Sequence, residues 1–239
     1  MSSAHLHRLS RWLVASFARV MLKLDVHRHG PPLEGQKLLV ANHPSCTDPF
    51  LISLVDPQPV RLLIVEEAFV VPVFGALLRK LGHIPVTVGE GRPAFDGALR
   101  RLQAGDSVAL FPEGWISPRL GGYNRPQTGT ARLALMTGVP VVPVGIYLPR
   151  ERNWVVSRMT NGRHTVGYWY LRGPYGMTVG EPMTFEGSVD DRERVREVTA
   201  SIMRRIIRLA AESEQRVTGQ APLQRRIARR KWVVPSGTG

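Results

Sequence analysis

A histidine and an aspartate lie five positions apart in the segment Asn42-His43-Pro44-Ser45-Cys46-Thr47-Asp48. A neutral imidazole is a suitable general base near pH 7, and a carboxylate can hold its ring in one tautomer and stabilise the imidazolium that forms. We therefore expect His43 to take a proton from a substrate hydroxyl while Asp48 orients it. Since such a pair also arises by chance, the interpretation needs a second motif.

Two further segments meet that need. Phe111-Pro112-Glu113-Gly114 follows about seventy residues later, where a predicted strand ends and a loop begins. Ligands bind at the carboxyl ends of strands in open α/β sheets, so this loop is a candidate part of the same site. Residues 139–144 read Val-Pro-Val-Val-Pro-Val, and the two prolines remove backbone donors, which predicts an edge strand or a pocket wall.

In combination, these motifs resemble the glycerolipid acyltransferase family, whose type member acylates lysophosphatidic acid. The resemblance covers roughly residues 35–190. It implies transfer of a fatty acyl group from acyl-CoA or acyl-carrier protein to a glycerolipid hydroxyl, with 1-acyl-sn-glycerol-3-phosphate as the leading acceptor and phosphatidic acid as product. His43 and Asp48 are then the catalytic pair, and Glu113 and Gly114 help to bind the acceptor head group. We group Asn42 with these binding residues because it shapes the turn before His43.

This sequence departs from the family at three expected cations. Trp115-Ile116-Ser117 stands where the family commonly has Thr-Arg-Ser. Val88 stands where the family tends to have an arginine, and Gln127-Thr128 stand where it often has lysines. Arginine is the usual bidentate partner of phosphate, so these losses leave the acceptor open among lysophosphatidic acid, another lysolipid, a glycolipid and a lipoamino acid. Four nearby arginines are candidate phosphate partners in their place: Arg92, Arg119, Arg125 and Arg132. Arg125 and Arg132 are favoured, because they lie near the family's acceptor segment.

Ser45 and Cys46 are alternative nucleophiles, because a hydroxyl or thiol near a histidine can form a covalent acyl intermediate. Both occupy variable positions of the motif by the resemblance. Direct transfer from thioester to hydroxyl is therefore the favoured mechanism. No cofactor and no metal site is expected, since the acyl donor is itself a substrate.

The elements that position these residues follow an alternating pattern of strands and helices, which predicts an α/β layered fold with a largely parallel central sheet flanked by helices. Asp48 is the expected N-cap and Pro49 the first residue of a helix, which would fix the His43 loop. Strands are expected at residues 37–41, 61–65, 84–88, 107–111, 139–147, 165–170 and 177–179, and helices at 8–24, 73–81, 94–103, 128–137 and 191–214.

Three regions are expected along the chain: an amphipathic N-terminal helix in residues 1–30, an acyltransferase core in 31–190 and a basic helical C-terminal extension in 191–239. Apolar residues recur at helical spacing in residues 8–24, and the sequence leaves open whether they pack on the core or lie in lipid headgroups. Residues 191–239 carry twelve Arg or Lys against five Asp or Glu, which makes the extension a basic patch.

The formal net charge of +13 predicts anionic partners, and an anionic membrane surface is favoured. Nucleic acid is not expected, because the basic tail lacks interleaved stacking aromatics. The single cysteine fits a reducing compartment. Because no stretch approaches the roughly 18 to 20 apolar residues of a membrane-spanning helix, we expect peripheral attachment at the cytoplasmic face of a membrane. A functional alternative of another class is a non-catalytic basic module that binds anionic membrane or nucleic acid.

Overall fold

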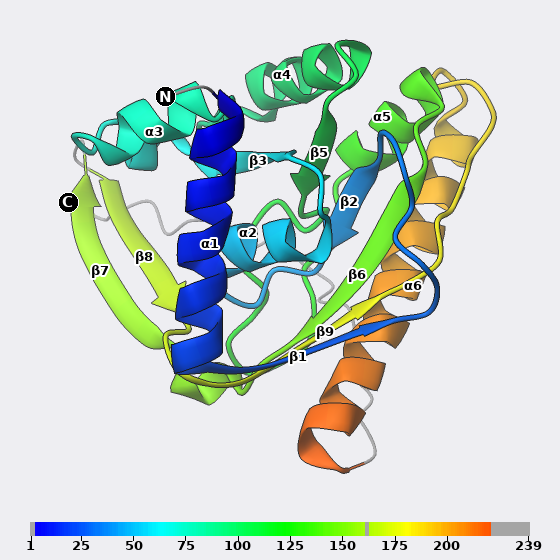
Figure 1. The fold of residues 1–239 in the computed structure, drawn as a ribbon. Helices are drawn as coiled ribbons and strands as arrows, with labels where there is room; N and C mark the ends of the chain where they lie inside the picture. The colour runs from blue at the N-terminus through cyan, green and yellow to red at the C-terminus, as the bar shows by residue number, and fades with distance from the viewer. Residues whose placement is uncertain (1–2, 161–162, 221–239) are drawn as a thin grey trace.

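A seven-stranded sheet runs through the centre of the computed structural model, which describes residues 3–160 and 163–220 (Figure 1). The strand order is β1-β9-β6-β2-β5-β3-β4, and every neighbouring pair is parallel except β6–β9. The fold class predicted from the sequence is thus confirmed. The strands are β1 (Leu22–Arg28), β2 (Leu38–Ala41), β3 (Val60–Val65), β4 (Ile84–Val86), β5 (Ser107–Leu110), β6 (Val141–Tyr147) and β9 (Gly173–Val179).

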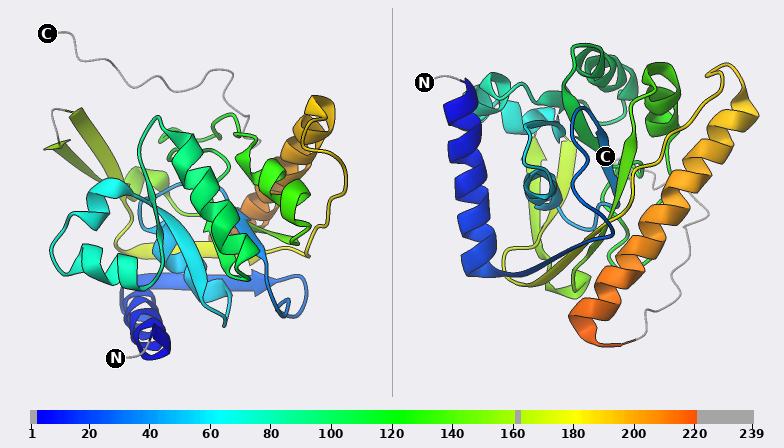
Figure 2. Two further views of the ribbon diagram at one scale, coloured as in Figure 1. Left: turned by 90° about the horizontal axis from the view of Figure 1, so that it is seen from above. Right: turned by 45° about the vertical axis from the view of Figure 1, so that its right-hand side comes forward.

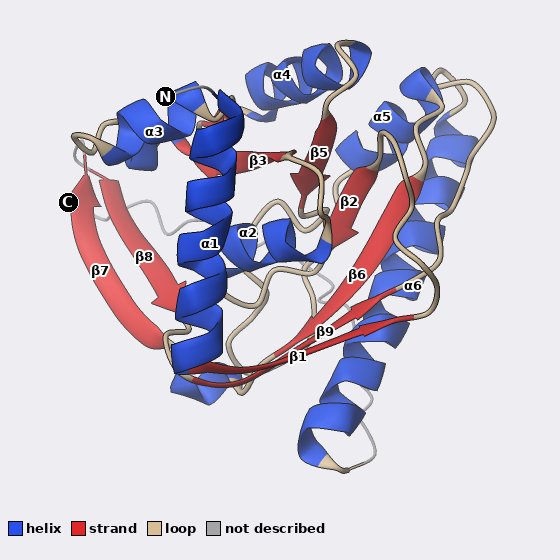
Figure 3. Ribbon diagram, viewed as in Figure 1, coloured by secondary structure: helices blue, strands red, loops and turns tan. Residues whose placement is uncertain are grey.

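Helices cover both faces of this sheet (Figure 3). Side chains alternate along β2, so that Leu39 and Ala41 join one apolar cluster and Leu38 and Val40 join the other. The first cluster includes residues of α1 and α2, and the second includes residues of α4, α5 and α6. The helices are α1 (Ser3–Met21), α2 (Asp48–Ile52), α3 (Phe74–Lys80), α4 (Gly91–Gln103), α5 (Gly129–Thr137) and α6 (Arg192–Thr218), with 3₁₀ helices η1 (Ser53–Val55), η2 (Glu66–Phe69) and η3 (Arg150–Arg152).

Of the two roles predicted for residues 139–144, an edge strand or a pocket wall, the edge position is wrong. Strand β6 pairs with β2 on one side and with β9 on the other, and Pro143 lies opposite Val40. Proline loses only its own donor, and the Pro143 carbonyl still accepts a 2.9 Å hydrogen bond from the Gly180 N–H. A strand can therefore be interior despite a proline when its other backbone groups are paired.

Helix α6 packs directly on β6 and β9, and Gly145 makes this close approach possible. A Cβ atom built at Gly145 would lie 2.0 Å from the backbone nitrogen of Ala210 on α6, so any larger residue would clash with the helix. The hydroxyl of Ser213 donates to the Gly145 carbonyl at 2.9 Å. The predicted boundary at residue 191 therefore does not separate two packing units, because α6 forms a layer of the core.

The N-terminal region also contributes to the sheet. The predicted helix of residues 8–24 ends at Met21, and the chain continues as β1, which pairs with β9 over its whole length. This strand was not predicted, because its residues lack a clear alternation of apolar and polar side chains. Since β1 completes the sheet, the predicted boundary at residue 30 does not mark off a separate helix.

Helix α1 packs on the core along one side only. Ala18 is buried and Val14 and Phe17 are partly buried against the first cluster, whereas Trp12 and Leu13 are 63% and 52% exposed. Figure 2 shows the helix upright along the outside of the molecule. Within residues 3–160 and 163–220, no helix has both the length and the apolar character needed to span a membrane.

Strands β7 (Trp154–Thr160) and β8 (Arg163–Trp169) form a separate antiparallel hairpin, and only its base lies near the end of α1 (Figure 1). The sequence predicted a strand near β8 but not β7. This hairpin matters for the site because its second strand is bonded to the loop that carries His43.

Candidate active site

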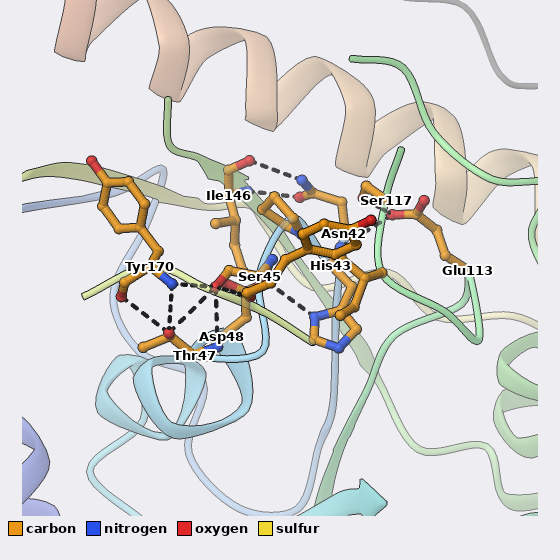
Figure 4. A network of polar contacts seen from close by, with 12 residues as sticks. Asn42, His43, Ser45, Thr47, Asp48, Glu113, Ser117, Ile146 and Tyr170 are labelled. Carbon is orange, nitrogen blue, oxygen red and sulfur yellow. Dashed lines mark hydrogen bonds and ion pairs between the residues drawn. The ribbon is translucent and has the colours of Figure 1, made fainter. Parts of the chain in front are cut away.

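The catalytic loop, defined as residues 42–48, leaves the carboxyl end of β2 and enters α2 (Figure 4). The His43 Nδ1 atom lies 3.0 Å from Asp48 Oδ2. The Asp48 side chain is fully buried, while the His43 side chain keeps 15% of its surface exposed. The His43 ring also stacks on Phe111 at a centroid distance of 4.1 Å. The imidazole is thus fixed from two directions and remains open to a substrate.

Asp48 is not the N-cap that the sequence predicted. Thr47 occupies that position, and Asp48 is the first helical residue, followed by Pro49. Its carboxylate instead faces back into the loop, where Oδ2 accepts from the Ser45 N–H at 2.7 Å. The Tyr175 hydroxyl donates to Oδ1, also at 2.7 Å. These hydrogen bonds satisfy the buried carboxylate oxygens, so that the carboxylate can remain charged and orient His43.

Asn42 does not face the open part of the site, so its grouping with the substrate-binding residues is wrong. Its side chain is wholly buried, donates to the Ile146 carbonyl at 2.8 Å and accepts from the Ile146 N–H at 2.7 Å. With these two hydrogen bonds, the Asn42 side chain pairs with the Ile146 backbone as a neighbouring strand would, and so ties the start of the catalytic loop to β6. Asn42 therefore positions His43, as a turn-forming residue would.

Glu113 joins the two motif loops. Its Oε1 accepts from the His43 N–H at 3.1 Å and from the Ser117 hydroxyl at 2.5 Å, and its Oε2 accepts from the Asn124 N–H at 2.7 Å. The residue is only 3% exposed, and burial raises the pKa of its carboxyl while these donors and the charge of Arg150 oppose the rise. Protein donors thus take the place of the expected acceptor contact.

Gly114 forms the turn that follows Glu113. Its φ is +64°, in the left-handed region, and its N–H donates to the Phe111 carbonyl at 3.0 Å. Gly114 is exposed, in contrast to Glu113. The expected role of Gly114 in binding the acceptor head group stays a prediction.

The other side of the catalytic loop is tied to β8. Ser45 Oγ donates to the Tyr168 carbonyl and accepts from the Tyr170 N–H, each at 2.9 Å, and Thr47 Oγ1 donates to the Tyr170 carbonyl at 3.0 Å. Ser45 is fully buried. Its hydroxyl therefore has a structural role, which argues against the Ser45 nucleophile.

Cys46 is poorly suited to be a nucleophile as well. Burial raises the pKa of the Cys46 thiol to about 11, against the opposing effect of its backbone hydrogen bond with Tyr168. The thiolate is the nucleophilic form of cysteine, so little of it is present near neutral pH. The burial of the Cys46 thiol thus argues against a covalent intermediate on it, and direct transfer stays the prediction.

Two of the four candidate phosphate partners are bound to groups outside both motif loops. Arg132 lies on α5, where its guanidinium donates to the Val189 carbonyl at 3.3 Å, and Arg92 pairs with Asp96. Arg125 is exposed and follows Asn124, whose N–H binds Glu113. Among the arginines predicted from the sequence, Arg125 is thus the one adjoining the Glu113 contacts.

Two residues of the site were missed in the sequence. Tyr175 supports Asp48, and buried Arg150 donates to the carbonyls of Pro118 and Gly122 at 2.7 and 2.8 Å, holding the loop after Glu113. Both lie more than thirty residues beyond the motifs they support. Only the sheet register brings them near, and no local pattern could have identified them.

The arrangement has the parts needed for general base catalysis. Because Nδ1 faces Asp48, Nε2 is the nitrogen of His43 that can take a proton from a substrate. The pair lies at the carboxyl edge of the parallel strands, where α/β proteins bind ligands. Fold and site together define an α/β protein in which a histidine, held by a buried carboxylate, lies at the carboxyl end of a central strand.

The chain belongs to the Acyltransferase family, whose model matches residues 23–147. It is 35% identical over 111 residues to the chloroplastic 1-acyl-sn-glycerol-3-phosphate acyltransferase BAT2 of Brassica napus, covering 44% of this chain and 31% of that protein. It is 26% identical over 120 residues to the 1-acyl-sn-glycerol-3-phosphate acyltransferase of Borreliella burgdorferi, covering 48% and 47%. The match therefore spans about a third to a half of the length of these curated relatives.

The fold is also similar to a solved structure. The crystal structure of the 1-acyl-sn-glycerophosphate (LPA) acyltransferase PlsC from Thermotoga maritima aligns with a TM-score of 0.61 and 23% identity, over 87% of this chain and 80% of that one. At this identity the likeness bears on the fold alone. It agrees with the α/β architecture, and the resemblance to glycerolipid acyltransferases seen in the sequence is confirmed by the family match.

Proposed function

We propose that this protein transfers a fatty acyl group from acyl-CoA or acyl-carrier protein to the hydroxyl of a glycerolipid, with 1-acyl-sn-glycerol-3-phosphate as acceptor and phosphatidic acid as product. The observation that carries this proposal is the His43–Asp48 pair at 3.0 Å, supported on the far side of the carboxylate by Tyr175. The names of the two acyltransferase relatives support the choice of acceptor.

In the proposed reaction, His43 Nε2 accepts the proton of the acceptor hydroxyl as the oxygen attacks the thioester carbonyl carbon. The tetrahedral intermediate collapses by breaking the carbon–sulfur bond, and the imidazolium returns the proton to the leaving thiolate. The products are an ester and a free thiol. Asp48 keeps Nδ1 protonated and stabilises the imidazolium between the two transfers.

Arg125 is the proposed first partner of the acceptor phosphate. It is exposed and directly follows Asn124, whose N–H binds Glu113, and Glu113 in turn accepts from the His43 N–H, which links Arg125 to the catalytic loop. Replacing Arg125 by Gln should raise the KM for a phosphorylated acceptor more than it lowers kcat. The matched control is Arg196→Gln, which removes an exposed cation from α6, outside both motif loops.

The protein is further proposed to act as a peripheral protein at the cytoplasmic face of an anionic membrane. Support comes from the apolar residues that α1 exposes and from the net charge of +13. The basic residues predicted to assist at the C-terminus, Arg225, Arg226, Arg229, Arg230 and Lys231, lie outside the described residues.

The test is a direct assay of the chemistry. Purified protein is incubated with acyl-CoA or acyl-carrier protein and a panel of lysolipids, while free thiol and lipid products are measured by absorbance and mass spectrometry. We expect equal amounts of thiol and esterified lipid, and loss of both in His43→Ala but not in the exposed control His27→Ala. Absence of lysolipid-dependent thiol release with every donor would favour the non-catalytic membrane-binding alternative.

A further inference from the structure

A pocket of about 600 Å³ lies at the base of the β7–β8 hairpin, next to the end of α1. Four cationic residues line it: Arg19, Lys23, Arg152 and Arg172. They come from α1, β1, η3 and the turn between β8 and β9. We call this feature the hairpin pocket.

The sheet register explains why residues so distant in sequence meet there. Strands β1 and β9 pair in parallel with Leu22 opposite Gly173, which places Lys23 beside the turn that contains Arg172. In the hairpin, the first residue of β7, Trp154, lies opposite the last residue of β8, Trp169, so Arg152 and Arg172 both adjoin this one end of the hairpin. The backbone positions of the four cationic residues are therefore set by strand pairing.

The charge of the hairpin pocket is unbalanced within the described chain. No aspartate or glutamate is among its lining residues, and none of the four cations forms an ion pair with another residue in the described ranges. Like charges gathered without counterions create a positive potential that attracts anions. The pocket thus has the charge expected of a site for a phosphate group.

The rim of the pocket is apolar and faces solvent. Val20 and Trp154 are 74% and 64% exposed, and Met21 and Leu171 are also exposed. Cations beside tryptophan and aliphatic side chains are typical of the headgroup level of a bilayer, where each part of an amphipathic lipid finds a partner. A soluble anion would use the cations but leave this apolar rim in water.

The hairpin pocket is also connected to the catalytic loop. Trp169 lies between Tyr168 and Tyr170, whose backbone groups bond to Ser45, and the Tyr168 carbonyl accepts from the Cys46 N–H at 2.7 Å. A lipid held at the pocket would therefore bring the bilayer surface beside the loop that carries His43.

We propose that the hairpin pocket binds the phosphate of an anionic membrane phospholipid and so anchors the bilayer next to the catalytic loop. This inference rests on the proposed action of the protein on membrane lipids. The bound lipid is a docking partner and is not consumed. The cations contact its phosphate, while Val20, Met21 and Trp154 contact its glycerol and upper acyl chains.

The test compares two triple variants of the full chain. One is Arg19→Gln with Lys23→Gln and Arg172→Gln, and the matched control on α6 is Arg196→Gln with Arg204→Gln and Arg208→Gln, all exposed cations without an ion pair in the described chain. Helix α6 lies away from α1 in Figures 1 and 2. Binding to phosphatidylcholine vesicles with and without phosphatidylglycerol is measured by sedimentation, and melting temperatures check the fold.

Each cation lost from the pocket should weaken binding to the anionic vesicles about fivefold. The cations of α6 lie away from the proposed contact with the bilayer, so the pocket variant should lose at least tenfold more affinity than the α6 control. Equal losses in both variants would mean that only net charge matters and would overturn the proposal. Displacement of wild-type protein from vesicles by inorganic phosphate or by CoA at concentrations near their own binding constants would instead assign the pocket to a soluble phosphate. Sedimentation requires no turnover, so it reports on the pocket even if no acyl transfer is found.

Discussion

The hydroxyl of Tyr175 donates a 2.7 Å hydrogen bond to Oδ1 of Asp48, the carboxylate oxygen turned away from His43. Tyr175 is completely buried, and burial together with the nearby Asp48 charge raises its pKa well above the usual range. The phenol therefore stays protonated and can act only as a donor to this carboxylate. We therefore infer that Tyr175 positions Asp48 within the proposed catalytic pair.

The first prediction follows from this bond. Tyr175→Phe removes one donor from a buried carboxylate, and hydrogen bonds to charged groups contribute about 1.5–3 kcal/mol. We expect kcat to fall about tenfold or more with little change in KM. The control is Tyr170→Phe, because the Tyr170 hydroxyl donates to the Pro174 carbonyl and does not touch Asp48. Equal falls in kcat in both variants would show that Tyr175 acts only through general stability.

Asp48→Asn should reduce both activity and stability. From the sequence alone we expect a severe loss of transfer with the fold intact. The structure revises the expectation of an intact fold, because the Ser45 N–H and the Tyr175 hydroxyl both donate to this carboxylate. An amide nitrogen would face a donor on one side, so unfolding free energy should drop by about 1–3 kcal/mol. Transfer should fall by about 10²–10⁴-fold, measured at a temperature where melting curves show the variant folded.

How far the sequence predicts this site depends on how local each contact is. His43, Asp48 and the Glu113 loop were found because their spacing and strand-end positions are visible in a linear pattern. Tyr175 was not, since it lies on β9, which reaches the site by pairing with β6, and Arg150 was not, since it follows β6, which pairs with β2. The misassigned role of Asn42 has the same origin, because its partner Ile146 is 104 positions away.

The fold shows a similar division. Strands preceded or followed by helices were located within a few residues, since a change of hydrophobic period marks them. Strand β1 was missed because it directly continues α1 and only Leu22 of its residues is buried. Strand β7 was missed because its apolar residues Trp154, Val155 and Val156 are exposed on a hairpin outside the main sheet and form no inward-facing alternation.

Cys46→Ser tests the direct mechanism. If the hydroxyl attacks the thioester without a covalent intermediate, the variant should retain activity within about threefold, because the raised pKa of the thiol leaves it unreactive. Intact-protein mass spectrometry of the wild type during turnover should find no acyl adduct. An acylated Cys46 peptide that is consumed when lysolipid is added would overturn the direct mechanism.

Stability should decline as the pH falls below about 6.5. Burial, then the charges of neighbouring residues, lowers the pKa of His83 to about 4, and its Nδ1 accepts a 3.1 Å hydrogen bond from the Leu62 N–H. Only the unfolded chain takes up this proton between pH 6.5 and 4, so the contribution is fully present above that window and is lost within it. Urea unfolding should show a loss of about 3 kcal/mol across this window, reduced in His83→Gln but not in His27→Gln. Equal pH slopes in all three proteins would exclude His83 as the cause.

The last prediction concerns attachment through α1. Deleting residues 1–24 would remove buried Ala18 and Leu22 and the start of β1, so substitution of exposed residues is the sharper experiment. Trp12 and Leu13 are more than half exposed, and full burial of such side chains contributes about 1.5–3 kcal/mol each. In vesicle sedimentation, Trp12→Ser with Leu13→Ser should weaken binding at least tenfold to neutral and anionic vesicles alike, because salt and lipid charge leave the apolar contribution largely unchanged.

Two comparisons make this prediction specific. Met136→Ser on α5 removes a side chain that is 48% exposed, close to the 52% of Leu13, and should leave vesicle binding unchanged if α1 is the attachment site. Neutralising the five predicted tail cations should weaken binding to anionic vesicles only, and high salt should abolish that difference because it screens charge. Binding that is lost entirely in high salt, and is indifferent to Trp12 and Leu13, would mean that attachment is purely electrostatic and that the apolar side of α1 does not enter the bilayer.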